Sequence, residues 1–354
     1  MTRSNSIKGR GTTNRVGARY LSTTRVEVDD GWLQPEADVK VRTTVITEKP
    51  RTIISRNNSP DIPFTISINP YRGCEHGCIY CYARPTHAYM DLSPGIDFET
   101  KLFAKPDAAS LLIAELSKPD YQVSPLALGT NTDPYQPIER EWKITRQIIE
   151  VLQKHHHPMT IVTKSWLVER DINLLADMAQ ENLVQVFLSV TTLDKELVRK
   201  MEPRTTAPER RLQTINNLKN AGIPVGVMFA PVIPFLNDSE METILTRATE
   251  AGVTHAGYVM LRLPHEIKDL FKEWLDIHYP LKTEHVMSMI RDIRGGKDND
   301  PNFNSRMRGQ GTYADMIAQR FSKTCHKLGL NSEKVKLNTD LFSKPAKTTQ
   351  MDLF

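Results

Sequence analysis

Six short apolar segments alternate with amphipathic segments along residues 64–261, and this rhythm constrains the fold more than any other feature of the sequence. The apolar segments have the length of buried strands, and the stretches between them repeat apolar residues at helical spacing. We expect strands at residues 64–68, 126–129, 159–163, 184–190, 225–230 and 256–261. We expect helices at residues 108–116, 143–154, 171–180, 207–221 and 239–251. Strands that alternate with helices predict a parallel sheet with crossover helices.

Three of the four cysteines lie within eight positions, directly after the first predicted strand. Cys74, Cys78 and Cys81 have the spacing C-x3-C-x2-C, which can aim three thiolates at one metal centre. Thiolates suit zinc or an iron–sulfur cluster. With three protein ligands, a cluster of four irons keeps one iron open to a small molecule that chelates it. Two alternatives stay open: a zinc site completed by His76 or His87, and three unrelated buried cysteines.

The composition limits the class of protein. A chain of 354 residues can hold one large domain with appendages or two domains, and a hydrophobic content of 39% suffices for a sizeable core. No apolar run approaches the length of a transmembrane helix, and the first residues lack the apolar stretch of a secretory signal. Four cysteines with three of them clustered form no disulfide framework, which predicts a reducing, cytoplasmic location.

We divide the chain into three predicted parts. Residues 1–60 form a basic arm with edge elements and are partly disordered; the arm either contacts phosphates or is a solvated tail. Residues 61–290 form the core. Residues 291–354 form a helical extension, with a helix at 313–328, and a poorly ordered tail from residue 331 onward.

Three polar motifs follow predicted strands, two of them at the point where the strand ends. The second strand leads into GTNTDPYQPIE (129–139), the third into TKS (163–165), and MEPRTTAPERR (201–211) follows the fourth. A glycine such as Gly129 lets the backbone approach a ligand closely, and Lys164 at a strand end suits a carboxylate. A plainer interpretation is open in both cases: a proline-stiffened turn with an Asx cap, and a solvated lysine.

The cysteine spacing and these three motifs resemble the radical S-adenosylmethionine (SAM) superfamily, and within it the branch related to spore photoproduct lyases. The resemblance covers about residues 64 to 265. It implies an α/β fold, a partial (β/α)6 barrel of the TIM type with N- and C-terminal extensions and with the reaction at the carboxyl ends of the strands. It also implies a [4Fe-4S] cluster on Cys74, Cys78 and Cys81. SAM would bind the open iron and be cleaved to a 5′-deoxyadenosyl radical.

The same resemblance implies contacts with SAM. Tyr80 is expected near the adenine, Lys164 at the carboxylate of the methionine part, and Ser189 at other polar groups of SAM. Arg262, after the sixth strand, is a candidate for contact with a phosphate or carboxylate. Further candidates for cofactor binding are Gly129, Asn131, Asp133, Ser165 and Arg204.

The sequence departs from the family pattern at one place. Spore photoproduct lyases have a hydrogen-donor cysteine at the end of the second strand, where this chain has Thr130-Asn131-Thr132-Asp133. Cys325 lies far along the chain and cannot be equated with that cysteine. Thymine-dimer reversal is therefore in doubt as the reaction. Tyr80, Tyr82 and Tyr135 are the candidates for a hydrogen donor, with simple packing as the alternative role.

The last five residues, Gln350-Met351-Asp352-Leu353-Phe354, resemble the peptide by which bacterial DNA polymerases and repair proteins dock in the sliding clamp. The peptide and the family resemblance together lead us to expect a nucleic-acid substrate, DNA above all, and a lyase-like or repair reaction. We also expect a reductant such as flavodoxin or ferredoxin. Two alternatives remain. One is a radical SAM enzyme that acts on RNA, a peptide or a metabolite, and the other is a non-enzymatic, metal-stapled clamp adaptor.

Overall fold

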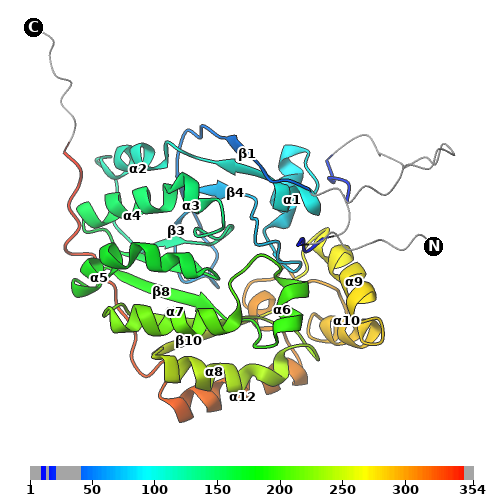
Figure 1. The fold of residues 1–354 in the computed structure, drawn as a ribbon. Coiled ribbons are helices and arrows are strands. Elements are labelled where there is room, and N and C mark those ends of the chain that lie inside the picture. Colours follow the sequence, from blue (N-terminus) through cyan, green and yellow to red (C-terminus); the bar gives the residue numbers. More distant parts are fainter. Residues whose placement is uncertain (1–8, 13–15, 21–40, 347–354) are drawn as a thin grey trace, which may run out of the picture.

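A seven-stranded sheet forms the centre of the computed structural model, which describes residues 9–12, 16–20 and 41–346. The strand order is β10-β9-β8-β7-β6-β3-β2. The six strands from β10 to β3 are parallel, and β2 (Ile54–Arg56) runs antiparallel to β3 at one edge. The parallel strands are β3 (Ile66–Ile68), β6 (Leu126–Leu128), β7 (Met159–Thr163), β8 (Val184–Ser189), β9 (Val225–Val232) and β10 (His255–Met260). The predicted fold, an open partial (β/α)6 barrel, is confirmed (Figure 1).

The crossover helices begin and end within two residues of the predicted ranges. They are α2 (Ala108–Leu116), α4 (Ile144–Lys154), α5 (Ile172–Gln180), α7 (Pro208–Asn220) and α8 (Met241–Ala251). In α4 the buried residues Ile144, Ile148 and Leu152 recur every four positions, so one face of the helix joins the main core. Figure 1 shows α4, α5, α7 and α8 arrayed along one side of the sheet. Short helical segments connect them: α3 (Glu139–Trp142), η2 (Trp166–Asp171), α6 (Lys195–Met201) and η3 (Asp238–Glu240).

A second, three-stranded sheet was not predicted. It has the order β1-β5-β4, with strands β1 (Thr44–Thr47), β5 (Lys101–Ala104) and β4 (Tyr71–Arg72). The cysteines follow β4 directly, and η1 (Arg84–Met90) and α1 (Ile96–Thr100) lead back to β5. The small sheet and these two helical segments therefore frame the cysteine-bearing loop.

The C-terminal helices pack at two places on the barrel. Helices α9 (Ile267–His278) and α10 (Thr283–Asp292) pack on each other. They share a hydrophobic cluster with Cys78, Ile79 and Tyr80. A short helix, α11 (Ser305–Arg308), contacts β10, and α12 (Thr312–Leu328) packs on α8. None of the helices in the described part of the chain is long and apolar enough to cross a membrane.

The segment 331–346 is not the poorly ordered tail that the sequence predicts. The amide of Asn338 donates a 2.8 Å hydrogen bond to the carbonyl of Asn182, and the amide of Ser343 donates one of 3.0 Å to that of His155. These contacts draw the segment along the amino ends of the strands, past α5 (Figure 1, in red). Residues 350–354, with the predicted clamp peptide, lie outside the described residues, so that partner stays a prediction.

Candidate functional site

The three cysteines lie on one loop, residues 73–82, which we call the cysteine loop. Cys74 and Cys78 are buried. Cys81 is half-buried. It packs against the hydrophobic cluster that contains Cys78 and against the one that contains Cys74. Burial raises the pKa of the Cys78 thiol to about 12 and that of Cys74 well above its ordinary value. The thiolate forms of these cysteines would therefore be stable only with a cation bound to them.

Glycine is required at two positions of the cysteine loop. Gly73 and Gly77 have φ angles of +75° and +66°, in the left-handed region that other residues rarely adopt. A side chain at Gly73 would come within 2.7 Å of Leu102, and one at Gly77 within 2.7 Å of the Glu99 carboxylate. These turns aim the three cysteines inward. Arg84 braces them, because its Nε donates a 2.9 Å hydrogen bond to the carbonyl of Cys78.

Residues 9–12, which we call the N-terminal strap, pack against the cysteine loop. The amides of Gly11 and Thr12 donate hydrogen bonds of 3.0 and 3.1 Å to the fully buried carboxylate of Glu99. The guanidinium of Arg84 donates to the same carboxylate at 2.6 Å. Arg10 donates to the backbone carbonyl of Glu99 at 2.9 Å, so it belongs to the interior and not to a solvated arm. Figure 1 shows the N-terminal segment, in dark blue, between α1 and α9.

The two histidines of the zinc alternative have other partners. His76 Nδ1 lies 3.3 Å from the carboxylate of Asp133, and His87 Nε2 forms a 2.9 Å hydrogen bond with the carbonyl of Lys101. Among the described residues, no three His, Cys, Asp or Glu side chains converge on a position for one metal ion. A four-iron cluster takes one thiolate per iron, so its ligands lie further apart than those of a single zinc ion.

The motif after β6 is tied to the end of β7. Thr163 Oγ1 and the amide of Lys164 donate to the Asp133 carboxylate at 2.7 and 2.8 Å. Burial opposes its ionisation, but His76 and these donors hold its pKa at about 2. A side chain at Gly129 would lie 2.1 Å from the carbonyl of Val162, so only glycine lets the backbone approach the neighbouring strand β7 this closely. These contacts favour a structural role for both residues.

Lys164 lies at the carboxyl end of β7, and its charge acts on the cysteine loop. Its ammonium lies 5.8 Å from the centroid of the Tyr80 ring and lowers the pKa of the Cys78 thiol against the larger effect of burial. No ion pair involves Lys164 within the described part of the chain. An ammonium beside this loop that forms no direct ion pair is available to an anionic group of a ligand.

Glu202 is a site residue that the sequence analysis missed. It is 1% exposed, and its carboxylate accepts hydrogen bonds from the hydroxyls of Tyr80 and Thr191 and from the guanidinium of Arg211. Burial opposes its ionisation, but Arg211 and Lys164 hold its pKa at about 2. Glu202 therefore fixes Tyr80 beside the cysteines. The only signal in the sequence was its place in the MEPRTTAPERR motif.

The remaining polar candidates divide by location. Arg204 lies over the cysteine loop, since it forms a 3.2 Å ion pair with Glu75 and its amide faces the carbonyl of His76. Ser165 accepts a hydrogen bond from the amide of Leu167 and so caps η2. The side chains of two further candidates differ in exposure: Ser189 is buried and Asn131 is exposed.

The two other tyrosine candidates lie in different surroundings. Tyr82 is 47% exposed, its hydroxyl donates to the carbonyl of Thr130 after β6, and the guanidinium of Arg262 lies 5.6 Å from its ring centroid. Tyr135 is fully buried, and its hydroxyl donates to Asp171 at 3.1 Å. The structure thus places Tyr80 and Tyr82 at the cysteine loop and directs the hydroxyl of Tyr135 into an internal ion-pair network. A role for any of them as hydrogen donor stays a prediction.

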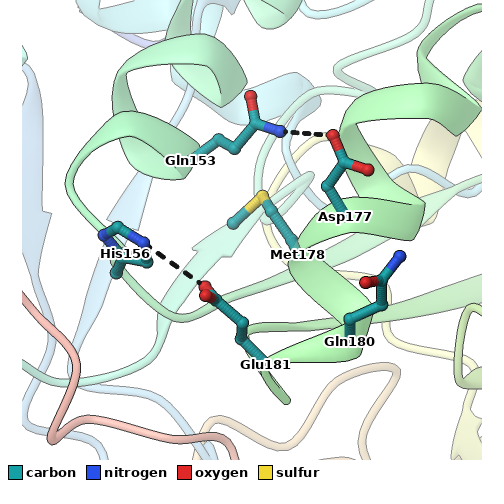
Figure 2. Close-up of a pocket in the computed structure, with 6 residues that line it drawn as sticks. All are labelled: Gln153, His156, Asp177, Met178, Gln180 and Glu181. Carbon is teal, nitrogen blue, oxygen red and sulfur yellow. Dashed lines mark hydrogen bonds and ion pairs between the residues drawn. The ribbon is translucent and has the colours of Figure 1, made fainter.

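A shallow hollow elsewhere on the surface is not part of this site. Figure 2 shows it between the ends of α4 and α5. The His156–Glu181 ion pair of 3.5 Å and the Gln153–Asp177 hydrogen bond of 3.0 Å cross its lining. It lies at the amino ends of β7 and β8, the edge of the sheet opposite to the cysteine loop.

The family model of the radical SAM superfamily matches residues 68–248, a range that holds all three cysteines and most of the parallel sheet. The chain belongs to the radical SAM superfamily. A protein of Mycobacterium tuberculosis described as uncharacterized is 37% identical over 254 residues, which are 71% of this chain and 74% of that protein. The spore photoproduct lyase of Clostridium acetobutylicum is 26% identical over 241 residues, 66% of each chain.

Solved structures of spore photoproduct lyase share the fold. The complex of that enzyme with dinucleoside spore photoproduct superposes with a TM-score of 0.58 at 14% identity, over 81% of this chain and 80% of the other. The present chain, itself a radical SAM superfamily enzyme, has no cysteine at the end of β6, where it reads Thr130-Asn131-Thr132-Asp133. Cys325 is buried in α12, among the core residues, and does not replace it.

Membership of the superfamily implies SAM and an iron–sulfur cluster, and the residues present fit both. The three free thiols, two buried and one half-buried, lie together on a loop that glycines and Arg84 hold in place. Lys164 adds a positive charge beside them. The carboxyl ends of the strands, where this loop lies, are the usual position of ligands in parallel α/β sheets.

Proposed function

We propose that Cys74, Cys78 and Cys81 hold a [4Fe-4S] cluster and that this enzyme cleaves SAM and acts on a nucleic acid, DNA above all, in a lyase-like or repair reaction. The observation that carries the proposal is the gathering of three thiols, two buried and one half-buried, on one loop at the carboxyl ends of six parallel strands. When bound, the cluster supplies the electron that cleaves SAM to methionine and a 5′-deoxyadenosyl radical.

The chain's own residues would orient SAM. Lys164 is placed to bind the carboxylate of the methionine part, because its ammonium acts on the cysteine loop and, among the described residues, makes no direct ion pair, although its charge also acts on Glu202. The Tyr80 ring, fixed by Glu202, offers an apolar surface to the adenine. Arg204 pairs with Glu75 above the loop, and its side chain is 37% exposed, so it remains accessible to a ligand.

The nucleic-acid substrate is proposed on two grounds. Spore photoproduct lyase, which shares this fold, was solved in a complex with dinucleoside spore photoproduct. In addition, an arginine and an exposed tyrosine, Arg262 and Tyr82, lie side by side next to Cys81. Thymine-dimer reversal itself is not proposed, because the end of β6 lacks a donor cysteine.

The test of the proposed chemistry uses protein reconstituted with iron and sulfide under anaerobic conditions. We expect about four irons per chain, and 5′-deoxyadenosine from SAM when dithionite is added. Changing Cys74, Cys78 or Cys81 to Ala should remove both the iron and the cleavage, because one iron of the cluster would lose its only protein ligand. Cys325→Ala is the matched control and should keep both. Tightly bound zinc without sulfide, or SAM cleavage that survives all three substitutions, would contradict the proposal.

A further inference from the structure

Arg262 extends from the end of β10 toward the cysteine loop. Its neighbours Leu261 and Leu263 are fully buried in the hydrophobic cluster that contains Cys78. Side chains of consecutive residues in an extended segment point to opposite sides. Arg262 accordingly points away from that cluster, and its guanidinium lies 5.6 Å from the centroid of the Tyr82 ring. The arginine is therefore directed at the residue that follows the third cysteine.

Three other arginines around the end of β10 are engaged by the protein. Arg306 makes two hydrogen bonds, of 2.7 and 2.6 Å, with the carboxylate of Asp61. Arg294 donates to the carbonyl of Leu261 at 2.5 Å. Arg308 donates to the carbonyl of Tyr258 at 3.2 Å. Arg294 and Arg308 hold residues 294–308 against β10 and its end, and Arg306 ties them to Asp61 before β3, so all three have structural roles.

Arg262 lacks such partners within the described part of the chain. Its Nε is buried without a hydrogen-bond partner, and Nη1 has a single weak contact, with the sulfur of Met307 at 3.8 Å. The nearby carboxylate of Asp61 is already bound on both oxygens by Arg306. A guanidinium has five donors, and a partly buried one left unpaired is costly. An anionic group of a ligand would satisfy it.

The surroundings favour a phosphate of a nucleic acid as that group. Tyr82 is 47% exposed beside Arg262. Phe303 is 52% exposed, with its ring centroid 4.7 Å from the guanidinium of Arg306. Proteins that bind single-stranded nucleic acids combine positive charges along the backbone with exposed aromatic rings on which bases stack. The end of β10 presents both features, with Arg262 beside Tyr82, the residue that follows Cys81.

We propose that Arg262 binds a backbone phosphate of the nucleic-acid substrate and thereby sets the adjoining nucleotide at Tyr82, beside the cysteine loop. The assignment rests on the proposed function, since it names the residue that recognises the proposed substrate class. It assigns Arg262 to the substrate and Lys164 to SAM. The two roles can be separated by experiment.

The experiment measures binding of a fluorescently labelled, mixed-sequence single-stranded DNA to the reconstituted protein by anisotropy, from 50 to 200 mM salt. Arg262→Ala should weaken binding about tenfold and reduce the slope of log affinity against log salt by about 0.7, the value for one lost phosphate contact on a single strand. Arg262→Lys should keep the slope, because the charge is retained, and lose part of the affinity. Circular dichroism and iron content show whether each variant is folded.

Two controls separate the possible causes. Arg247→Ala removes an equal charge from an exposed pair with Glu209 and should leave DNA binding unchanged; an equal loss there would mean non-specific attraction and overturn the assignment. Binding of SAM should be the same in wild type and Arg262→Ala, and a selective loss of SAM binding would assign Arg262 to the carboxylate of SAM instead.

The remaining outcomes distinguish the two proposals. If wild type and Arg262→Ala bind DNA equally, the assignment of Arg262 fails while the proposed substrate class stands. If the wild-type protein binds neither DNA nor RNA at low salt, the proposed substrate class fails, and the assignment fails with it.

Discussion

At the scale of single residues, His157 shows how burial fixes a protonation state. It is fully buried at the amino end of β7. Its Nε2 lies 2.7 Å from the hydroxyl of Tyr121 and its Nδ1 lies 3.0 Å from the carbonyl of Pro158. A neutral ring satisfies both, with Nδ1–H donating to the carbonyl and Nε2 accepting from the tyrosine. Burial lowers the pKa of His157 to about 4.

This pKa predicts how stability depends on pH. Because the folded value lies below the value of about 6.5 in an unfolded chain, the unfolded state binds more protons between pH 6.5 and 4. The free energy of unfolding should therefore be constant above pH 7 and fall through that window, by up to about 3 kcal/mol for this residue. Urea unfolding at several pH values measures it. His157→Gln should flatten the dependence, whereas His156→Gln, at an exposed ion pair, should not; equal pH profiles for wild type and His157→Gln would contradict the prediction.

The candidate residues could be predicted where the sequence itself carries their chemistry. The cysteine spacing indicates a metal site whatever the fold, and Lys164 is recognisable as a charge directly after an apolar strand. Glu202 and Glu99 were not identified, because a glutamate in a polar stretch is usually solvated. Only the tertiary contacts show that both are buried beside the cysteine loop, each with an arginine partner.

At the scale of elements, the N-terminal strap and the cysteine loop depend on one carboxylate. Glu99 on α1 joins the strap to Arg84, and all of these groups are excluded from water. Glu99→Gln would leave the buried Arg84 guanidinium without its counter-charge. Loss of one partner of a buried pair typically costs about 3–5 kcal/mol. We therefore expect a lower melting temperature and less bound iron after reconstitution.

The matched control for Glu99 is Glu209, which pairs with Arg247 on the surface. Glu209→Gln should change stability by less than about 1 kcal/mol, because exposed ion pairs contribute little. Melting curves and iron content, measured for both variants, test whether the cysteine loop depends on the N-terminal strap. Full iron content and an unchanged melting temperature in Glu99→Gln would show that the cysteine loop does not need the strap.

The elements differ in how far the sequence predicts them. The crossover helices are long and amphipathic, so α2, α4 and α7 were predicted nearly to the residue. Strands β4 and β5 have two and four residues, too few for a periodic pattern. Helix α1 was hidden by Asp97 and Glu99, which are buried although charged. Helix α9 was missed although its buried residues recur at helical spacing.

At the scale of the whole molecule, the candidate site joins distant parts of the chain. The strap supplies residues 9–12, the cysteine loop supplies residues 73–82, and the strand ends supply Lys164 and Arg262. Segment 331–346 lies at the opposite edge of the sheet. The parallel order of the strands could be predicted from the sequence, and it determines where the site lies. The packing of the terminal segments could not be predicted, because their contacts do not follow from a periodic pattern in the sequence.

The central claim is that the three cysteines hold a four-iron cluster with one iron open to SAM. Electron paramagnetic resonance of the reconstituted, dithionite-reduced protein tests it most directly. We predict the signal of a reduced [4Fe-4S] cluster, and a clear change in that signal when SAM is added, because SAM would bind the open iron. A protein with four irons whose signal stays the same at saturating SAM, or one that gives no cluster signal, would contradict the claim.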